Sequence, residues 1–156
     1  MIEVQERVEI AGTPERVFAL LSDVERIPEW QPNVVSVTKT DDGPVAVNTE
    51  FEQSWRFFGR QRRVPSRVTA WKEGELLAVS GDAGFVDFYC GFELTPLSDG
   101  RTQLISRAEF RMRAVWKLAQ PILARELRRE MAEELGSFQR LVEAERPARG
   151  AHPAAR

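Results

Sequence analysis

The chain has 156 residues, which is enough for one domain with a buried core and too few for two domains of ordinary size. Hydrophobic residues make up 42% and charged residues 29% of the sequence, a balance that excludes disordered and fibrous proteins. The net charge of -2 excludes a general attraction to nucleic acids or anionic membranes, so any charged binding surface would be local.

The cellular compartment can be inferred from cysteine use and from the N-terminal residues. Cys90 is the only cysteine, which excludes an intramolecular disulfide and a disulfide-stabilised secreted scaffold. Residues 1–10 lack a basic segment followed by an apolar run, and no segment approaches the roughly 20 apolar residues of a membrane span. We therefore expect a cytoplasmic protein that is neither exported nor embedded in a membrane.

The first elements are a strand and a short helix. Apolar and polar residues alternate over residues 2–10, as in a strand with one buried face, although Glu6 falls on the apolar side. Residues 13–21 carry the signals of a helix start, because Thr13 can cap the helix and Pro14 suits its first position. We expect this helix to bury its apolar side chains.

A second helical turn, residues 24–27, ends at Pro28. Trp30 follows between Pro28 and Pro32. We expect the two short helices to support one end of the fold. Trp30 should lie at the seam between this support and the mouth of any cavity, as a packing anchor more than a ligand contact.

Six more strands are expected in the middle of the chain, because period-2 alternation recurs between turn signals rich in Gly, Asp and Pro. Their approximate ranges are 33–40, 49–58, 62–71, 76–81, 83–97 and 102–113. Pro65 cannot donate a hydrogen bond to a neighbouring strand, so it predicts a sheet edge or a bulge.

Residues 115–145 have the spacing of a long amphipathic helix. The expected buried stripe consists of Val115, Ala119, Ile122, Leu123, Leu127, Met131, Leu135, Phe138 and Val142. Pro121 predicts a kink, or a break after the first turn. Residues 146–156 form a polar tail rich in Pro, Gly and Ala, which we expect to be disordered.

This order of elements predicts an α+β fold with a mostly antiparallel sheet of about seven strands, which should twist and curl. The last helix would be roughly 40 Å long, enough to cover the concave side of the sheet. Where the helix and the sheet do not touch, a cavity can remain.

Three segments carry a resemblance to a known family: "VEIAGTPERVFALLSDVERIPEWQPNV", "FELTPLSDGRTQL" and "PILARELRREMAEELGSFQRLVEAE". In this order they resemble the START/Bet v 1-like (SRPBCC) superfamily, and within it the bacterial polyketide cyclase/dehydrase and lipid-transport branch. The resemblance implies a single domain over residues 1–145 with a helix-grip fold, in which the sheet wraps around the C-terminal helix. It also implies a deep apolar pocket between them.

Side chains expected to face inward give the candidate ligand-binding residues. The apolar ones are Trp30, Phe51, Trp55, Val68, Phe88, Phe92, Phe110, Ala119, Ile122 and Leu123. The polar ones that could orient a ligand are Gln53, Ser66, Ser106 and Cys90. A pocket of this kind suits a flat or branched apolar ligand. The alternative is that these side chains simply fill the core, and that Gln53 bonds to backbone or lies in solvent.

Catalytic residue sets are sparse. The only histidine, His152, lies in the expected tail, which argues against a Ser-His-Asp triad and a His-based metal site. Cys90 has no visible activating base and is favoured as a small buried residue. Asp87 and Tyr89 have the parity opposite to the pocket face, and Glu6 is favoured as a residue of a twisted strand. We therefore assign no catalytic residue, and no cofactor or metal is implied.

An arginine-rich outer surface is expected around residues 56–67 and 107–113. It contains Arg56, Arg60, Arg62, Arg63, Arg67, Arg107, Arg111 and Arg113, with Phe58 as an exposed aromatic. Such a surface can contact RNA or the headgroups of a membrane. We favour the alternative, in which the arginines pair across strands with Glu50, Glu52, Glu73 and Glu109.

The expected function is binding or transport of a small hydrophobic ligand, lipid or polyketide-like, in the internal cavity. One alternative is a cofactor-independent polyketide cyclase/aromatase or dehydratase, with Gln53, Ser66, Ser106 and Glu6 as its polar groups. A second alternative is an interaction module that uses the arginine-rich surface. The oligomeric state is left open between a monomer and a homodimer.

Overall fold

The computed structural model describes residues 1–57 and 59–145, and its strands form one antiparallel sheet in the order β1-β7-β6-β5-β4-β3-β2. The strands are β1 (Ile2–Ile10), β2 (Val34–Lys39), β3 (Glu50–Phe57), β4 (Arg60–Lys72), β5 (Leu76–Asp82), β6 (Val86–Pro96) and β7 (Thr102–Met112). The predicted α+β helix-grip fold is confirmed. Phe58, His152 and the predicted tail over residues 146–156 lie outside the described residues.

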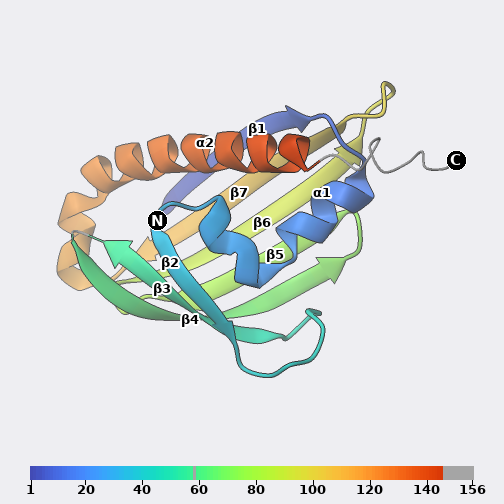
Figure 1. The fold of residues 1–156 in the computed structure, drawn as a ribbon. Helices are drawn as coiled ribbons and strands as arrows, with labels where there is room; N and C mark the ends of the chain where they lie inside the picture. The colour runs from blue at the N-terminus through green and yellow to red at the C-terminus, as the bar shows by residue number, and fades with distance from the viewer. Residues whose placement is uncertain (58, 146–156) are drawn as a thin grey trace, which may run out of the picture.

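The sheet is a meander from β2 to β7, closed by the return of β1 beside β7. In that last pair Ile2 lies opposite Phe110 and Ile10 opposite Thr102. The strands β1 and β2 are therefore at opposite edges, although they are neighbours in the sequence. Two short helices, α1 (Pro14–Leu21) and η1 (Val24–Glu29), connect these edges, and a long helix, α2 (Gln120–Ala144), runs across the curved sheet (Figure 1).

Helix α1 begins as its sequence predicts. The Oγ of Thr13 accepts a hydrogen bond of 3.2 Å from the backbone N–H of Arg16, and Pro14 opens the first turn. The helix buries its apolar face, and the ring of Phe18 packs edge-on against Trp71 with 4.9 Å between the ring centroids. This contact fixes α1 against the sheet.

The start of the C-terminal helix differs from the prediction. Residues Ala114–Ala119 form a 3-10 helix, η2, and α2 begins at Gln120 with Pro121 in its first turn, so the break predicted at this proline is confirmed. The burial predicted for Val115 and Ile122 is wrong, because these residues are 70% and 76% exposed. Val115 lies in the 3-10 helix, none of whose residues is buried. Ile122 lies within α2, where the 3.6-residue period that buries Met131 and Phe138 places it on the opposite face.

The C-terminal end of α2 is held by residues near α1, and the two lie side by side in Figure 1. The guanidinium of Arg16 donates hydrogen bonds of 2.9 Å to the carbonyl oxygens of Val142 and Glu145. The backbone N–H of Ala11 donates a 2.9 Å bond to the carboxylate of Glu143. These bonds satisfy carbonyls that a helix end leaves without partners, and they fix α2 over the sheet.

Pro65 lies where β4 has only one neighbour. It is opposite Glu52 of β3, whereas the pairing of β4 with β5 begins at Ser66. The predicted sheet edge is therefore confirmed at Pro65, although β4 has neighbours on both sides from Ser66 onward. The pairing of β4 with β5 also contains a register shift between Val68 and Ala70.

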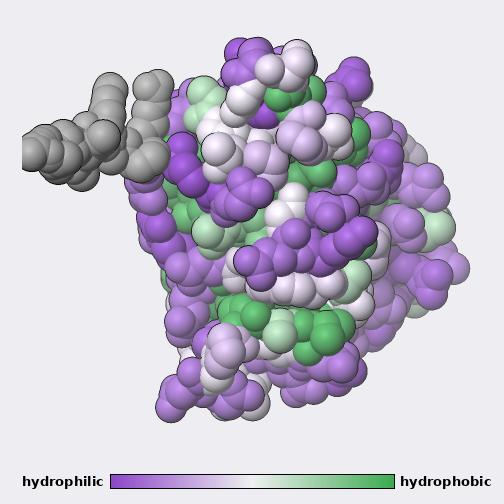
Figure 2. Space-filling view, turned by 90° about the vertical axis from the view of Figure 1, so that its right-hand side faces the viewer, coloured by the Kyte–Doolittle hydropathy of each residue, from purple (hydrophilic) through white to green (hydrophobic). Residues whose placement is uncertain are grey.

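The face that contains α1 is mainly hydrophilic, with hydrophobic residues in separate groups (Figure 2). Most apolar side chains thus point into the core between α2 and the sheet. None of the helices in residues 1–57 and 59–145 combines the length and apolar character needed to cross a membrane.

Candidate ligand-binding site

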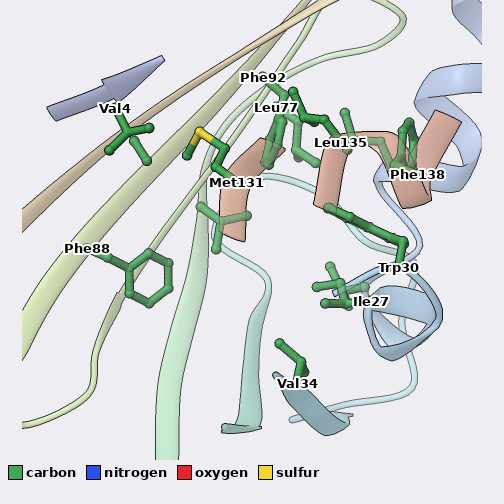
Figure 3. Packing of buried hydrophobic residues seen from close by; sticks show 14 of the residues in the cluster. Val4, Ile27, Trp30, Val34, Leu77, Phe88, Phe92, Met131, Leu135 and Phe138 are labelled. Atoms are coloured by element: carbon green, nitrogen blue, oxygen red, sulfur yellow. The ribbon is translucent and has the colours of Figure 1, made fainter. Parts of the chain in front are cut away.

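A cavity of about 110 Å³ lies between the concave side of the sheet and the middle of α2. Phe88 and Met131 lie on one side of this region, and Ile27, Trp30 and Val34 lie on the other (Figure 3). A volume of this size exceeds the space that a single water needs. The two short helices and the start of β2 close one side of the cavity, in agreement with the support expected from the sequence.

Seven of the candidate ligand-binding residues line this cavity. They are Trp30, Gln53, Trp55, Phe88, Cys90, Phe92 and Phe110. They come from the end of η1 and from strands β3, β6 and β7, which are far apart in the sequence. The indole ring of Trp55 lies 5.1 Å from the ring of Phe88, so the two form a continuous aromatic wall.

The other seven candidates lie outside the cavity wall. They are Phe51, Ser66, Val68, Ser106, Ala119, Ile122 and Leu123. Parity along a strand predicts the face of a side chain correctly, but it gives no position along the strand. The cavity also lies beneath a later part of α2 than Ala119 and Leu123, at Leu127 and Met131.

Gln53 is the centre of a buried hydrogen-bond chain. Its Oε1 accepts a 3.1 Å bond from the Nε1–H of Trp55, and its Nε2 donates a 3.0 Å bond to the Oγ of Ser66. The hydroxyl of Ser66 in turn donates to the carbonyl of Val64 at 3.1 Å. An indole can only donate, so the amide oxygen must face Trp55. One amide N–H of Gln53 remains free of these bonds at the cavity wall.

Trp30 packs into the core and also lines the cavity. It is 3% exposed, and its ring meets Phe138 of α2 edge-on at 4.9 Å and Phe92 of β6 at 6.3 Å. Its Nε1–H is buried and has no hydrogen-bond partner among the described residues. The fold itself therefore gives this N–H no acceptor, and a buried donor in that state costs about 1–3 kcal/mol.

Two glutamates of α2 complete the cavity wall, and the sequence analysis missed both. Burial raises the pKa of Glu134 to about 8, with smaller contributions from the charges of Glu130 and Glu133. Burial also raises the pKa of Glu130, an effect that the nearby Asn33 opposes. The signal was present in the spacing, because residues 127, 130, 131 and 134 lie on one helical face. These glutamates were assigned to the solvated face.

Comparisons with known proteins agree with this architecture. The family model described as polyketide cyclase/dehydrase and lipid transport matches residues 1–143. The chain belongs to this family. The polyketide cyclase/dehydrase and lipid transport family is a branch of the START/Bet v 1-like (SRPBCC) superfamily, which confirms the resemblance inferred from the sequence.

Solved structures share the fold of this polyketide cyclase/dehydrase and lipid transport domain at low identity. An aromatase/cyclase from Streptomyces sp. R1128, Zhui, is 20% identical, with a TM-score of 0.78 over 95% of this chain and 97% of that chain. A START superfamily protein from Mycobacterium smegmatis is 15% identical, with a TM-score of 0.78 over 92% and 99%. A conserved protein from Geobacillus kaustophilus is 17% identical, with a TM-score of 0.75 over 92% and 96%. The comparison with curated proteins gives no match.

Cys90 is the other titratable group of the cavity wall in this family member. Burial raises the pKa of its thiol to about 12, and the charge of Glu134 contributes. The thiol is therefore neutral at ordinary pH, which agrees with the prediction of a small buried residue. Its neighbours Asp87 and Tyr89 point outward as predicted, because Asp87 pairs with Arg113 at 2.5 Å and Tyr89 is 38% exposed.

Glu6 does not reach the cavity. It is half-buried on β1, where it pairs with Ser106 of β7, and neither residue contributes to the cavity wall. This position agrees with the favoured prediction that Glu6 is a residue of the strand and not of the pocket.

The arginine-rich outer surface forms cross-strand pairs, as favoured from the sequence. Arg67 pairs with Glu50 at 2.7 Å, and Arg63 lies 3.8 Å from Glu52. Two other arginines pair with acids that were not predicted: Arg107 with Glu93, and Arg113 with Asp82 and Asp87. Arg62 instead lies over the ring of Phe85. Within the described residues, Glu73 and Glu109 form none of the ion pairs.

No group of three or more His, Cys, Asp or Glu side chains that could hold a metal ion is found in residues 1–57 and 59–145. The cavity of this family member therefore offers aromatic and aliphatic surface, two carboxyls, a neutral thiol and a few hydrogen-bond donors.

Proposed function

We propose that this protein binds a small, mainly apolar ligand, lipid or polyketide-like, in the cavity under α2 and carries or sequesters it. The observation that carries the proposal is the composition of the wall, which is mostly aromatic and aliphatic and contains few polar groups. Cavities of this kind bury a ligand by the hydrophobic effect and orient it through a few placed hydrogen bonds.

The state of the polar groups supports binding ahead of catalysis by the residues first considered. Gln53 uses its amide oxygen and one amide N–H to hold Trp55 and Ser66. Ser106 and Glu6 lie outside the wall. A ligand would therefore meet a wall whose β3 side chains are already held in place, which lowers the entropy cost of binding.

The test is a fluorescence titration with N-phenyl-1-naphthylamine, a neutral apolar dye, together with native mass spectrometry of the purified protein. The variant Val79→Phe adds bulk to a buried position of the cavity wall. The control Val115→Phe makes the same change at an exposed position. We expect the dye to bind the wild type and the control, and at least about tenfold more weakly to Val79→Phe.

Circular dichroism must first show that both variants are folded. Equal binding of the dye by the two variants would place its site elsewhere on the protein. Absence of dye binding and of any co-purified ligand would overturn the proposal as a whole.

A second candidate function is an enzyme of the cyclase or dehydratase kind. Glu134, which lines the cavity, is a better candidate for its acid than the polar groups chosen from the sequence. A carboxyl whose pKa is about 8 can supply a proton at neutral pH inside the cavity. Loss of turnover of a polyketide-like substrate in Glu134→Gln, with dye binding unchanged, would support this function. Turnover that survives the substitution would exclude Glu134 as its acid.

A further inference from the structure

The two cavity carboxyls differ from the other acids of α2 in their partners. Glu126 and Glu133 both pair with Arg129 on the outside of the helix, the second at 2.7 Å. Glu130 and Glu134 line the cavity, and among the described residues neither forms an ion pair. Helix α2 also contains Arg125 and Arg128, yet the one arginine in the cavity wall is the exposed Arg56 of β3.

A carboxyl in such surroundings is most stable without its charge. Apolar walls disfavour the ionised form, and a second carboxyl one helical turn away disfavours it further. In its neutral form Glu134 presents an O–H donor to the cavity, where it has no hydrogen-bond partner among the described residues.

Two other side chains of the wall, Trp30 and Gln53, keep a hydrogen-bond donor unused. The Nε1–H of Trp30 has no hydrogen-bond partner among the described residues, and the residue is only 3% exposed. Gln53 retains one amide N–H beyond its bonds to Trp55 and Ser66. A complementary ligand therefore brings acceptor oxygens into an otherwise apolar environment.

We propose that the cavity selects neutral carbonyl ligands over carboxylates of the same shape, with the carboxyl of Glu134 donating a hydrogen bond to the carbonyl oxygen. The proposal rests on the proposed function and names the ligand class of the same cavity. It separates this protein from a carrier of fatty-acid anions, because an anionic headgroup would lose its hydration in an apolar wall to which the described residues contribute no basic side chain except the exposed Arg56.

Three naphthalene compounds with one ring system and different polar groups test the selection. They are 2-acetylnaphthalene, which is a neutral ketone, 2-naphthoate, which is an anion, and 2-naphthylmethylammonium, which is a cation. Each displaces N-phenyl-1-naphthylamine in a competition titration at pH 6. We expect the ketone to bind about tenfold or more tightly than the carboxylate, because only the carboxylate gives up the hydration of a charge when it enters the apolar cavity.

The pH dependence tests the donor. A group with a pKa of about 8 is protonated at pH 6 and about 90% ionised at pH 9, so the affinity for the ketone should fall by about tenfold. The charged and titratable groups around it are Glu130, Glu133, Cys90 and Arg56. Cys90, with a pKa of about 12, stays neutral over this range.

Variants separate donation from shape. Glu134→Gln keeps a neutral donor that does not titrate, so ketone affinity should stay within about threefold of the wild type at pH 6 and lose its pH dependence. Glu134→Leu removes the donor and should weaken the ketone about tenfold at pH 6. The control Glu126→Gln changes a glutamate of the same helix that pairs with Arg129 and whose charge is not among those that raise the pKa of Glu134, so it should leave all three affinities unchanged.

The outcomes are distinguishable. Tightest binding of the ammonium compound would show a cation site and overturn the inference, as would equal or tighter binding of 2-naphthoate. If the dye binds but the ketone does not displace it, the inference fails while the proposed function stands. If neither the dye nor any naphthalene compound binds, the proposed function fails.

Discussion

The Nε1–H of Trp55 donates a 3.1 Å hydrogen bond to the Oε1 of Gln53, two residues earlier on the same strand. Both side chains face the cavity, and the free end of the Gln53 amide is tied to Ser66 on β4. The aromatic wall is therefore positioned by a polar contact within the sheet. This arrangement explains why a glutamine can stand between apolar residues on an inward face, because its amide oxygen and one of its two amide N–H groups are bonded.

The substitution Gln53→Leu should reduce the free energy of unfolding by about 1–3 kcal/mol, because it leaves the Trp55 N–H without its acceptor and Ser66 without its donor. Urea unfolding monitored by tryptophan fluorescence measures the change. The matched control is Gln61→Leu on β4, where the glutamine is exposed and the expected effect is below about 0.5 kcal/mol. Equal effects in the two variants would mean that the buried chain contributes nothing of its own.

The carboxyl of Glu134 should make stability depend on pH. Its pKa is raised from 4.5 to about 8 by folding, so the folded state binds more protons than the unfolded state between these values. The contribution of the wild-type carboxyl is therefore most favourable below about pH 4.5 and becomes less favourable as the pH rises towards 8.

Glu134→Gln removes this titration, so its advantage over the wild type should grow by about 1–3 kcal/mol between pH 5 and pH 7. Urea unfolding at the two pH values measures the advantage, with Glu126→Gln as the control, because its charge is not among those that raise the pKa of Glu134. A constant difference between wild type and Glu134→Gln would show that the carboxyl is ionised or well solvated in the folded protein.

The fold could be predicted from the sequence because it depends on repeated local patterns. Alternation along the strands, turn residues between them and the capping of α1 by Thr13 each predict an element that the structure contains. The start of the last helix was predictable only in part, because Pro121 is compatible with a kink as well as with a break. The structure has a 3-10 helix over Ala114–Ala119, and none of its residues is buried.

The candidate site was predictable only in part, for a similar reason. Parity gives the inward face of β3, and with it Gln53 and Trp55. It does not show which part of the strand faces the cavity and which part packs against other core residues. Phe51 was therefore assigned to the pocket, whereas it is buried in the core. Glu134 was missed because a carboxyl on an arginine-rich helix is usually solvated, and only the helical spacing to Met131 indicates otherwise.

The position of α2 over the cavity should depend on Arg16. This side chain donates to the carbonyls of Val142 and Glu145, which would otherwise lack partners at the helix end. Arg16→Gln should reduce the free energy of unfolding by about 1 kcal/mol and speed amide hydrogen exchange in the last turns of α2. The control is Arg111→Gln on the exposed side of β7, which should change neither quantity. Unchanged exchange in Arg16→Gln would mean that other contacts hold this helix end.

The thiol of Cys90 reports on whether the cavity is closed to water and reagents. Its pKa is raised from 9.0 to about 12 by burial, and alkylation requires the thiolate. At pH 8 the reactive fraction should fall from about one in ten in the unfolded chain to about one in ten thousand in the folded protein. Alkylation by iodoacetamide, followed by mass spectrometry, should therefore be about a thousandfold slower in buffer than in concentrated urea. N-Phenyl-1-naphthylamine should slow it further by occupying the same cavity, whereas alkylation at the unfolded rate would show that the thiol is open to solvent.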